Sequence, residues 1–299
     1  MVLMLFNDSK KLKPLVSSTG WKILRFINNE PSYPLKIAKS LGIHEQKVYY
    51  HVKKMLDAGI IKIVREEEIK GANAKFYAPC SSGFGVSLNE KESMNNSKIL
   101  EFFNEFNLKG FNGKIVVGSP EPHGPLKTWA KDSHYSAILS FFLGNHIGFS
   151  GIDSISIDTD IKLANDYSSD NFILIGGPGV NILTYDLNEH FPAKFQAEFV
   201  GQAPSANFGK GFKSLKTGKE YSASSVGVIQ KIKNPFNPKK ALIVFAGVGK
   251  SGTYSAIHAF ISSTLEILKD YSKDSDFCRI VQGNDLNGDG KIDSFEVLE

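Results

Sequence analysis

The chain has 299 residues, of which 41% are hydrophobic and 22% are charged, so it can form a packed core and is not wholly disordered. Its longest apolar runs, residues 1–6 and 241–246, are far shorter than the roughly 20 residues of a membrane-spanning helix, and we expect no membrane association. Residues 1–6 also lack the flanks of a secretory signal. The two cysteines, Cys80 and Cys278, have no CxxC spacing, which excludes a disulfide framework and a cysteine zinc site. These features favour a cytoplasmic protein.

The net charge of +4 is unevenly distributed along the chain. Residues 1–80 contain 14 of the 35 Lys/Arg and 7 of the 31 Asp/Glu, so they carry a charge of +7, and the rest of the chain carries −3. A basic module joined to a slightly acidic one is typical of a protein whose first part meets a polyanion. The alternative is that these charges only solvate a surface.

Three helices are predicted in succession over residues 17–59. The first begins at Ser17 or Ser18, the second begins at Pro34 and is closed by Gly42, and the third spans residues 44–58 and is closed by Gly59. Each has an apolar stripe at helical spacing. The stripe residues are Trp21, Ile23, Leu24, Phe26 and Ile27, then Leu35, Ala38 and Leu41, then Val48, Val52, Met55 and Leu56.

A β-hairpin is predicted directly after the third helix. Residues 60–64 are rich in isoleucine and valine, residues 65–68 are charged, residues 71–73 form a turn, and residues 75–77 return as a second strand. Three helices followed by a hairpin are the layout of an α+β winged helix-turn-helix.

The segment LKIAKSLGIHEQKVYYHVKKMLDAGII, residues 35–61, resembles the ArsR-type family of winged helix-turn-helix proteins. Met55 stands where that family usually has leucine. The resemblance covers roughly the first 80 residues and implies DNA binding. Relatives of this type often sense metals through cysteine or histidine clusters, but only His44, His51 and Cys80 occur here, and we expect His51 to be packed in the core.

The candidate DNA-binding residues lie on the third helix and in the hairpin. Glutamine can pair with adenine, lysine with guanine or phosphate, and tyrosine with phosphate. The candidates are Gln46, Lys47, Tyr49, Tyr50, Lys53 and Lys54 on the helix, and Arg65, Lys70 and Lys75 in the hairpin. The acidic residues 66–68 would repel the DNA backbone, which leaves the wing contact in doubt or places these carboxylates away from the duplex. The alternative is a winged helix that binds a protein.

Residues 81–112 are predicted to connect two domains. Residues 80–96 have the composition of a linker with a turn. Residues 97–108 form a short helix whose face carries Ile99, Leu100, Phe102, Phe103 and Phe106. Such a face must be buried, either against the larger domain or against a second copy of the chain. The domains expected are therefore 1–80, a connecting segment 81–112, and 113–299.

The larger domain shows strands alternating with helices. Strands are predicted at residues 115–117, 154–158, 173–175, 194–199, 226–232 and 241–246, and helices at 134–143, 180–189 and 253–268. Continuous apolar strands alternating with helices imply an α/β domain with a mixed, partly parallel sheet.

Four phrases in this region carry a second resemblance: VVGSPEPHGPLKTWAKDSHYSAILSFFLG, ILIGGPGVNILTYDLNEHFP, NPFNPKKALIVFAGVGKSGT and RIVQGNDLNGDGKIDSFEVLE. Together they resemble the α/β S-layer-like domain of archaeal proteins, which also occurs behind a winged helix in predicted archaeal regulators. The resemblance covers about residues 113–299 and implies a fold without a known ligand or reaction. Surface-layer proteins would carry a signal peptide and an anchor. We expect neither in this chain, so the arrangement of a cytoplasmic regulator fits better.

A calcium loop is predicted at residues 285–296, which match the pattern D-x-[DN]-x-[DN]-G-x5-E throughout. The predicted ligands are Asp285, Asn287, Asp289, the carbonyl of Lys291, Asp293 and Glu296, with Gly290 at the sharp turn. The approach to the loop is strand-like and only three residues follow Glu296, so we expect an isolated EF-type loop with a structural calcium ion. The alternative is a solvated acidic turn.

Three loops after strands are candidates for ligand binding. Residues 247–251, GVGKS, fail the phosphate-loop motif because residue 244 is valine, although Lys250 and the following helix could hold a small anion. Residues 176–179 could cradle an anion or form only a tight turn. Glu121, His123, Asp132 and His134 could bind a metal or a small ligand, but they match no catalytic spacing, and a loop held by prolines and polar side chains is the favoured interpretation. Without GxSxG, HExxH or CxxC, we expect no enzyme.

These features predict a DNA-binding transcriptional regulator that acts as a homodimer on double-stranded DNA and whose second domain senses an unidentified small ligand or assembles subunits. The alternative is a structural or interaction protein of the cell envelope that uses the winged helix as a docking module.

Overall fold

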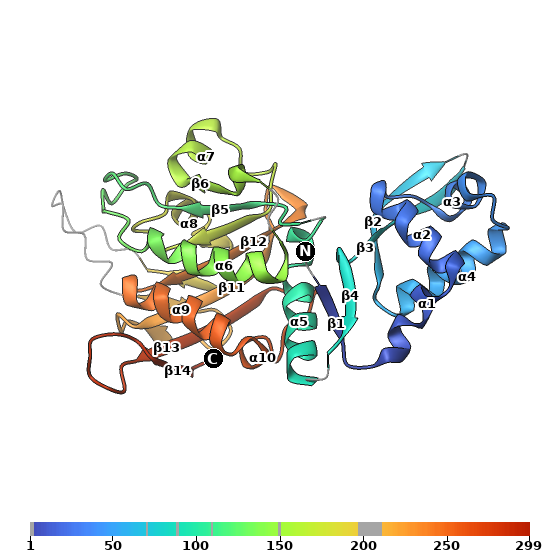
Figure 1. The fold of residues 1–299 in the computed structure, drawn as a ribbon. Coiled ribbons are helices and arrows are strands. Elements are labelled where there is room, and N and C mark those ends of the chain that lie inside the picture. The colour runs from blue at the N-terminus through green and yellow to red at the C-terminus, as the bar shows by residue number, and fades with distance from the viewer. Residues whose placement is uncertain (1–2, 70, 88–89, 109, 149–150, 197–210) are drawn as a thin grey trace. The chain divides into compact units, whose positions relative to one another are not determined.

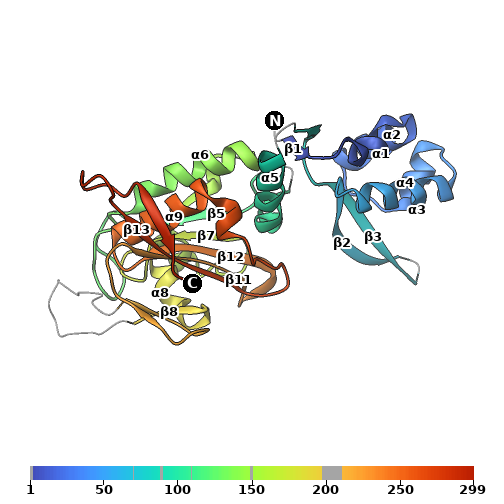
Figure 2. The same cartoon turned by 90° about the horizontal axis from the view of Figure 1, so that it is seen from below.

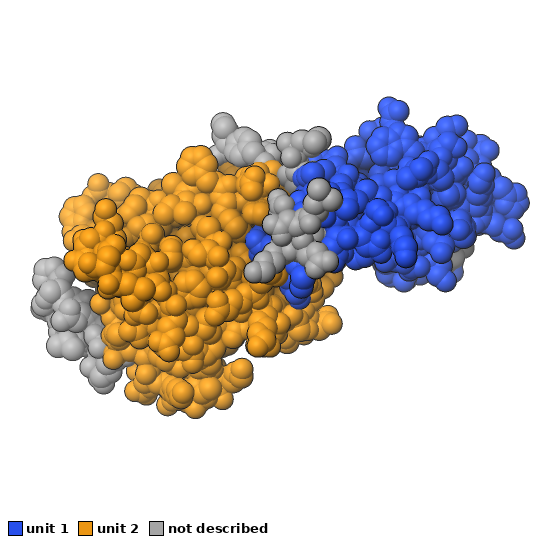
Figure 3. Space-filling model, turned by 60° about the horizontal axis from the view of Figure 1, so that its bottom comes forward, with its two compact units in different colours: residues 1–100, 107–109 blue, residues 101–106, 110–299 orange. Residues whose placement is uncertain are grey.

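The computed structural model describes residues 3–69, 71–87, 90–108, 110–148, 151–196 and 211–299 (Figure 1). The chain forms two compact units, residues 1–100 with 107–109 and residues 101–106 with 110–299 (Figure 3). The division lies at Leu100, later than the expected boundary at residue 80, because residues 81–100 fold with the first unit. No helix among the described residues is both long and apolar enough to cross a membrane.

The first unit contains the three predicted helices and the predicted hairpin (Figure 1). The helices are α2 (Ser18–Asn29), α3 (Pro34–Leu41) and α4 (Glu45–Asp57), preceded by the short α1 (Lys13–Val16). The side chain of Ser17 caps α2 by accepting a hydrogen bond from the Gly20 N–H. Gly42 ends α3 in the left-handed conformation with φ 63°, which glycine adopts without strain. The winged helix-turn-helix layout is therefore confirmed.

The buried stripe of each helix is narrower than the apolar pattern predicted. The buried residues are Gly20, Ile23, Leu24 and Ile27 in α2, Pro34, Ile37 and Ala38 in α3, and Val48, His51, Val52 and Met55 in α4. Trp21, Leu35 and Leu56, which were expected in the stripes, are 51%, 52% and 36% exposed. Each follows a stripe member by one position, which turns it about 100° around the helix and away from the core.

The hairpin is longer than predicted. Strand β2 (Ile61–Ile69) pairs with the antiparallel β3 (Ala72–Pro79), and a bulge separates Ile63 from Arg65. The charged run 65–68 therefore continues the strand, and Ala72 and Asn73, expected in the turn, already belong to β3.

The segment predicted as a linker contains regular structure. Strand β4 (Gly83–Val86) pairs in parallel with β1 (Leu3–Phe6), and the Phe6 and Phe84 rings stack with centroids 6.3 Å apart. Helix α5 extends from Glu90 to Phe102, so it starts before the predicted residue 97 and ends before the predicted residue 108. The linker interpretation of residues 80–96 is wrong because β4 completes a two-stranded sheet with the start of the chain.

The second unit contains a seven-stranded mixed sheet among its described residues, in the order β14-β13-β11-β12-β7-β5-β6. Its strands are β5 (Lys114–Val117), β6 (Ile155–Ile157), β7 (Phe172–Ile175), β11 (Val226–Asn234), β12 (Asn237–Gly247), β13 (Phe277–Asn284) and β14 (Ser294–Val297). Strands β12, β7, β5 and β6 are parallel, and β11, β13 and β14 join antiparallel. The predicted α/β fold with a mixed sheet is confirmed. A smaller sheet contains β8 (Ala193–Phe195), β9 (Phe212–Ser214) and β10 (Glu220–Tyr221), and part of the strand expected at 194–199 falls outside the described residues.

Helices cover both faces of the large sheet (Figure 2). Helices α6 (Ser136–His146) and α9 (Lys250–Ser262), followed by α10 (Thr264–Ile267), lie on one face, and α7 (Asp158–Ala164) and α8 (Ile182–Asp186) pack together on the other. Successive side chains of a strand point to opposite faces of the sheet. The strands therefore form one core with the helices on the first face and another core with the helices on the second face.

The aromatic residues at and just after the end of α5 are fully buried inside the second unit. Phe102, Phe103 and Phe106 have no exposed surface, and the Phe102 ring lies 5.0 Å from Tyr271 and 5.4 Å from Phe260 between ring centroids. Of the two alternatives for these rings, burial against the large domain is therefore the one observed. They offer no surface to a second copy.

Candidate nucleic-acid interface

Helix α4 separates its side chains into a core face and a solvent face. Val48, Val52 and Met55 are buried against α2 and α3. All six candidate residues of this helix are exposed on the remaining surface, namely Gln46, Lys47, Tyr49, Tyr50, Lys53 and Lys54. The tyrosines Tyr49 and Tyr50 are 50% and 59% exposed, and large aromatic side chains of this exposure are available to a partner.

His51 belongs to the core face, as predicted. It is 9% exposed, and its ring lies edge-on to Tyr50 with centroids 5.4 Å apart. Burial lowers the pKa of His51, and the neighbouring Lys47 lowers it further. The imidazole therefore packs as a neutral group, which leaves the positive charge of α4 to its lysines.

The wing cations are paired with the acidic residues beside them. Arg65 Nε lies 3.0 Å from a Glu67 carboxylate oxygen, and the Arg65 guanidinium lies 4.1 Å from the centre of the Phe76 ring. Lys75 Nζ lies 3.6 Å from a carboxylate oxygen of Glu66, its partner in the strand register. These pairs give Glu66 and Glu67 of the acidic run 66–68 a structural role and neutralise the positive charges of Arg65 and Lys75. Lys70, the third wing candidate, lies outside the described residues.

A groove of about 540 Å³ lies between α3, the start of α4 and the hairpin. Its lining brings Tyr49 and Lys75, both predicted, next to Lys36 and Lys39 of α3, which were not predicted. In helix-turn-helix proteins the first helix of the motif crosses the DNA backbone. The i, i+3 spacing of Lys36 and Lys39 was the signal that could have identified them.

A second hollow, of about 580 Å³, lies on the other side of α4. There Tyr50 and Lys54 line the same surface as Lys10, Lys11 and Lys13, all of which are exposed. These three lysines precede the predicted helices and were not predicted as DNA-binding residues. Their clustering in the sequence was the only signal that could have identified them. Together the two hollows extend the basic surface to both sides of α4.

The predicted calcium loop connects β13 to β14. Asn284 pairs with Ser294 across the two strands, and the Asp285 carboxylate accepts hydrogen bonds from the N–H groups of Gly288 and Gly290, both at 2.7 Å. Gly290 has the predicted left-handed turn, with φ 84°. Glu296 is exposed on β14, opposite Gln282. Within the part of the chain that the structure describes, which includes this whole loop, no three carboxylate, histidine or cysteine groups are gathered so that they could hold a metal ion.

The polar residues of the loop after β5 do not form one cluster. His123 Nε2 lies 2.6 Å from Asp158 Oδ2, and His123 Nδ1 lies 2.8 Å from the Glu121 carbonyl oxygen. The fully buried Asp158 also accepts hydrogen bonds from the N–H groups of Ser119 and Ile182. Asp132 instead bonds to Thr253. The favoured interpretation, a loop held by polar side chains, is the one observed for His123, and Asp158 was missed because it lies 35 residues away in sequence.

Comparison with protein families divides the chain in the same way. Residues 21–64 match the helix-turn-helix domain family, and residues 150–264 match the S-layer like family, outer domain. The first match includes most of α2, all of α3 and α4 and the start of β2, and the second extends from just before β6 to the first residue of α10. The chain therefore joins a helix-turn-helix domain to an S-layer-like domain. Comparison with curated proteins gives no match.

Proposed function

We propose that the protein is a transcriptional regulator, related to the ArsR type, that binds double-stranded DNA through the exposed face of α4. The observation that carries the proposal is that glutamine, tyrosine and lysine side chains occupy this face of the second helix of a helix-turn-helix. These side chains read base edges and hold phosphates, and the second helix of the motif is the one that enters the major groove.

The charge distribution supports the same proposal. Lys39 lies on one side of α4, together with Lys36, whose Nζ is 3.1 Å from a Glu30 carboxylate oxygen, and Lys10, Lys11 and Lys13 lie on the other side. Lysines that flank a reading helix are placed to contact the two phosphate backbones of a major groove. Arg65 and Lys75 of the wing contribute less, and so does Lys36, because their charges are already balanced by glutamates.

The regulator is proposed to act in the cytoplasm as a homodimer, with the second unit sensing a ligand or assembling subunits. A single winged helix covers few base pairs, and a two-fold dimer places two reading helices about one DNA turn apart. Size-exclusion chromatography with light scattering, at micromolar concentration and with and without DNA, tests this part of the proposal. A monomer under both conditions would contradict it.

The loop at residues 285–296 is proposed to bind a structural calcium ion. Its oxygen donors are those that calcium prefers, and Gly288 and Gly290 supply the turns of such a loop. The proposed ligands are Asp285, Asn287, Asp289, the Lys291 carbonyl, Asp293 and Glu296. Since their carboxylates are not gathered in the described structure, calcium would have to draw them together.

Gel-shift experiments with the full chain and fragments of its own genome test DNA binding. A regulator should retain a small set of fragments in the presence of excess non-specific DNA, because specific sites bind about 10³–10⁷-fold more tightly than random sequence. Equal retention of all fragments, or none, would contradict the proposal. It would favour the alternative, a cell-envelope protein that docks through its winged helix, which the similarity to the S-layer like outer domain supports.

A further inference from the structure

The hollow of about 580 Å³ beside α4 contains a buried histidine as well as lysines. We call it the lysine hollow, after the four lysines of its lining, Lys10, Lys11, Lys13 and Lys54. His51 also lines this hollow, although it belongs to the core face of α4 and is 9% exposed. A side chain that is buried and still lines a hollow lies at its floor, whereas the lysines are exposed around it. A ligand that fills the hollow would therefore meet His51 at its inner end.

The ring nitrogens of His51 are not used by the protein. The ring lies edge-on to the Tyr50 ring, with centroids 5.4 Å apart, and neither nitrogen has a hydrogen-bond partner within the part of the chain that the structure describes. His258 Nδ1 is both unpartnered and shielded from solvent, whereas the nitrogens of His51 are not shielded. An imidazole always has at least one N–H donor, and a nearly buried donor without a partner costs free energy. The floor of the lysine hollow thus offers a donor to a ligand.

The four lysines make this hollow positive. None of them forms an ion pair among the described residues, in contrast to Lys36 and Arg65 elsewhere in the first unit, which are paired with glutamates. One carboxylate, that of Asp57, is part of the lining. Four ammonium groups and one carboxylate attract an anion. A phosphate group suits them, because its oxygens accept hydrogen bonds from both lysine and histidine.

The free protein keeps His51 neutral. Burial lowers the pKa of His51 and Lys47 lowers it further, but a bound phosphate acts in the opposite direction because its negative charge stabilises the imidazolium. The charged and titratable side chains around the ring are Lys47, Tyr50, Lys54 and Asp57 of α4 and the three lysines that precede α2. Among these side-chain types, histidine is the one that ordinarily changes charge between pH 5 and 8. Proton uptake by His51 would therefore accompany phosphate binding in this range.

We infer that the lysine hollow binds a phosphate group of the DNA backbone and that His51, by taking up a proton, makes this contact depend on pH. The lysines attract the phosphate, and a ring N–H of His51 donates a hydrogen bond to one of its oxygens. Tyr50 and Lys54 line the hollow and belong to the exposed face of α4, so a duplex read by that face has backbone phosphates nearby. Because DNA binding and protonation are linked, each strengthens the other by the same factor. The inference rests on the proposed binding of DNA.

Fluorescence anisotropy of the full chain with a short random-sequence duplex, at constant salt and from pH 8 to 5.5, tests the inference. A random sequence is sufficient because phosphate contacts do not depend on sequence. The affinity of the wild type should rise about tenfold as pH falls, the usual value of a hydrogen bond to a charged group. His51→Gln keeps a polar N–H but cannot gain a charge, so it should bind DNA like the wild type at pH 8 and lose most of the rise. A defect in folding alone would lower the affinity at pH 8 as well.

Matched variants assign the pH dependence to this hollow. Lys10→Ala combined with Lys13→Ala should lower the affinity and reduce the rise, because the phosphate is no longer held over His51. Both lysines are exposed, so this variant should fold even if His51→Gln does not. Lys36→Ala combined with Lys39→Ala removes two lysines from the other side of α4 and should keep the rise. His44→Gln, which changes the exposed cap residue of α4, should keep it too.

Proton uptake provides a direct measurement. Calorimetric titration with the same duplex at pH 6, in two buffers of different ionisation enthalpy, should show that the wild type takes up more protons per chain than His51→Gln. The inference is overturned if the affinity of the wild type does not depend on pH, or if His51→Gln keeps the full rise and the full proton uptake. In either case DNA binding itself survives. If no duplex is bound at any pH, the proposed function fails and the inference fails with it.

Discussion

Replacement of both Lys53 and Lys54 by alanine should weaken DNA binding and make it less sensitive to salt. Both side chains are exposed on α4 and neither belongs to its buried stripe, so the fold should be unaffected. Each phosphate contact contributes about −0.9 to the slope of log K against log salt, and the loss of two contacts should make the slope less negative by about 1.8. Between 50 and 200 mM salt, the wild type should therefore lose about 12-fold more affinity than the double variant.

Fluorescence anisotropy with a retained genomic fragment, at four or more salt concentrations, measures this slope. The matched control is Lys233→Ala with Lys239→Ala, which removes two exposed lysines from the second unit. A double variant at Arg65 and Lys75 should change the slope less than the α4 variant, because both cations are paired with glutamates. Equal slopes for the wild type and the Lys53/Lys54 variant would contradict the proposal that α4 is the helix that contacts DNA.

Three further predictions follow from the same structure. Alanine at Gln46 or Tyr50 should relax sequence preference with little change in the salt slope, measured by selection from random DNA, and unchanged preference would exclude these residues from base contacts. Calcium should raise the Tm of the wild type more than magnesium does and more than that of Glu296→Gln, whereas identical responses would leave the loop as an acidic turn. Burial raises the pKa of Asp132 above its ordinary 3.8, so the folded state holds this proton more tightly and loses stability as pH rises above that value. Urea unfolding from pH 3.5 to 7 should therefore show Asp132→Asn gaining stability over the wild type as pH rises, and a constant difference would contradict this reasoning.

The elements that depend on neighbouring residues were predictable. The three helices of the first unit follow from apolar spacing together with the caps at Ser17 and Gly42, which are local features. The central strands β7 and β12 follow from short apolar runs that are buried on both sides. Stripe width was less predictable, because Trp21 and Leu35 are apolar and yet lie at the edges of their helices.

Pairings between distant segments were not predictable. Strand β4 has the weak pattern Gly-Phe-Gly-Val, and only its partner β1, about 80 residues earlier, makes it a strand. Strand β14 was hidden within the calcium pattern, since Glu296 fits both a ligand position and an exposed strand position. In both cases the hydrogen-bonding partner decides the structure, and a single segment contains no information about its partner.

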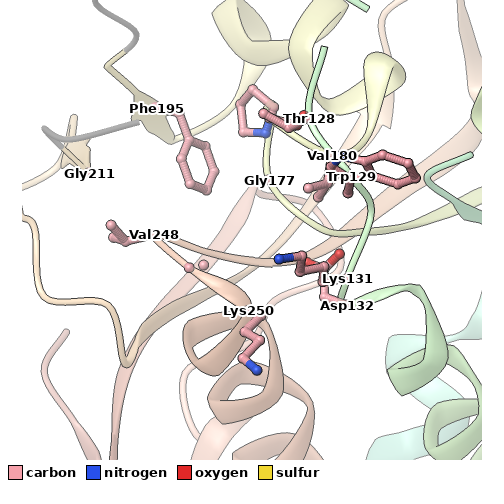
Figure 4. Close-up of a pocket in the computed structure, with 14 residues that line it drawn as sticks. Thr128, Trp129, Lys131, Asp132, Gly177, Val180, Phe195, Gly211, Val248 and Lys250 are labelled. Atoms are coloured by element: carbon pink, nitrogen blue, oxygen red, sulfur yellow. The ribbon is translucent and has the colours of Figure 1, made fainter. Parts of the chain in front are cut away.

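The hollow at the carboxyl ends of β5, β7 and β12 (Figure 4) shows the same limit. From the sequence, residues 176–179 were best interpreted as a tight turn, whereas residues 247–251 only failed the phosphate-loop motif; in the structure Gly247 packs closely against Gly252. Their second property, that they enclose a hollow together with the loop after β5, exists only in the folded sheet. Asp132 and its partner Thr253 are 121 residues apart, so neither the bond that holds Oδ2 nor the unsatisfied Oδ1 was visible in the chain. A buried carboxylate with a missing donor lowers the stability of the fold, so the energetic cost of Asp132 is likewise a property of the folded chain and not of its sequence neighbours.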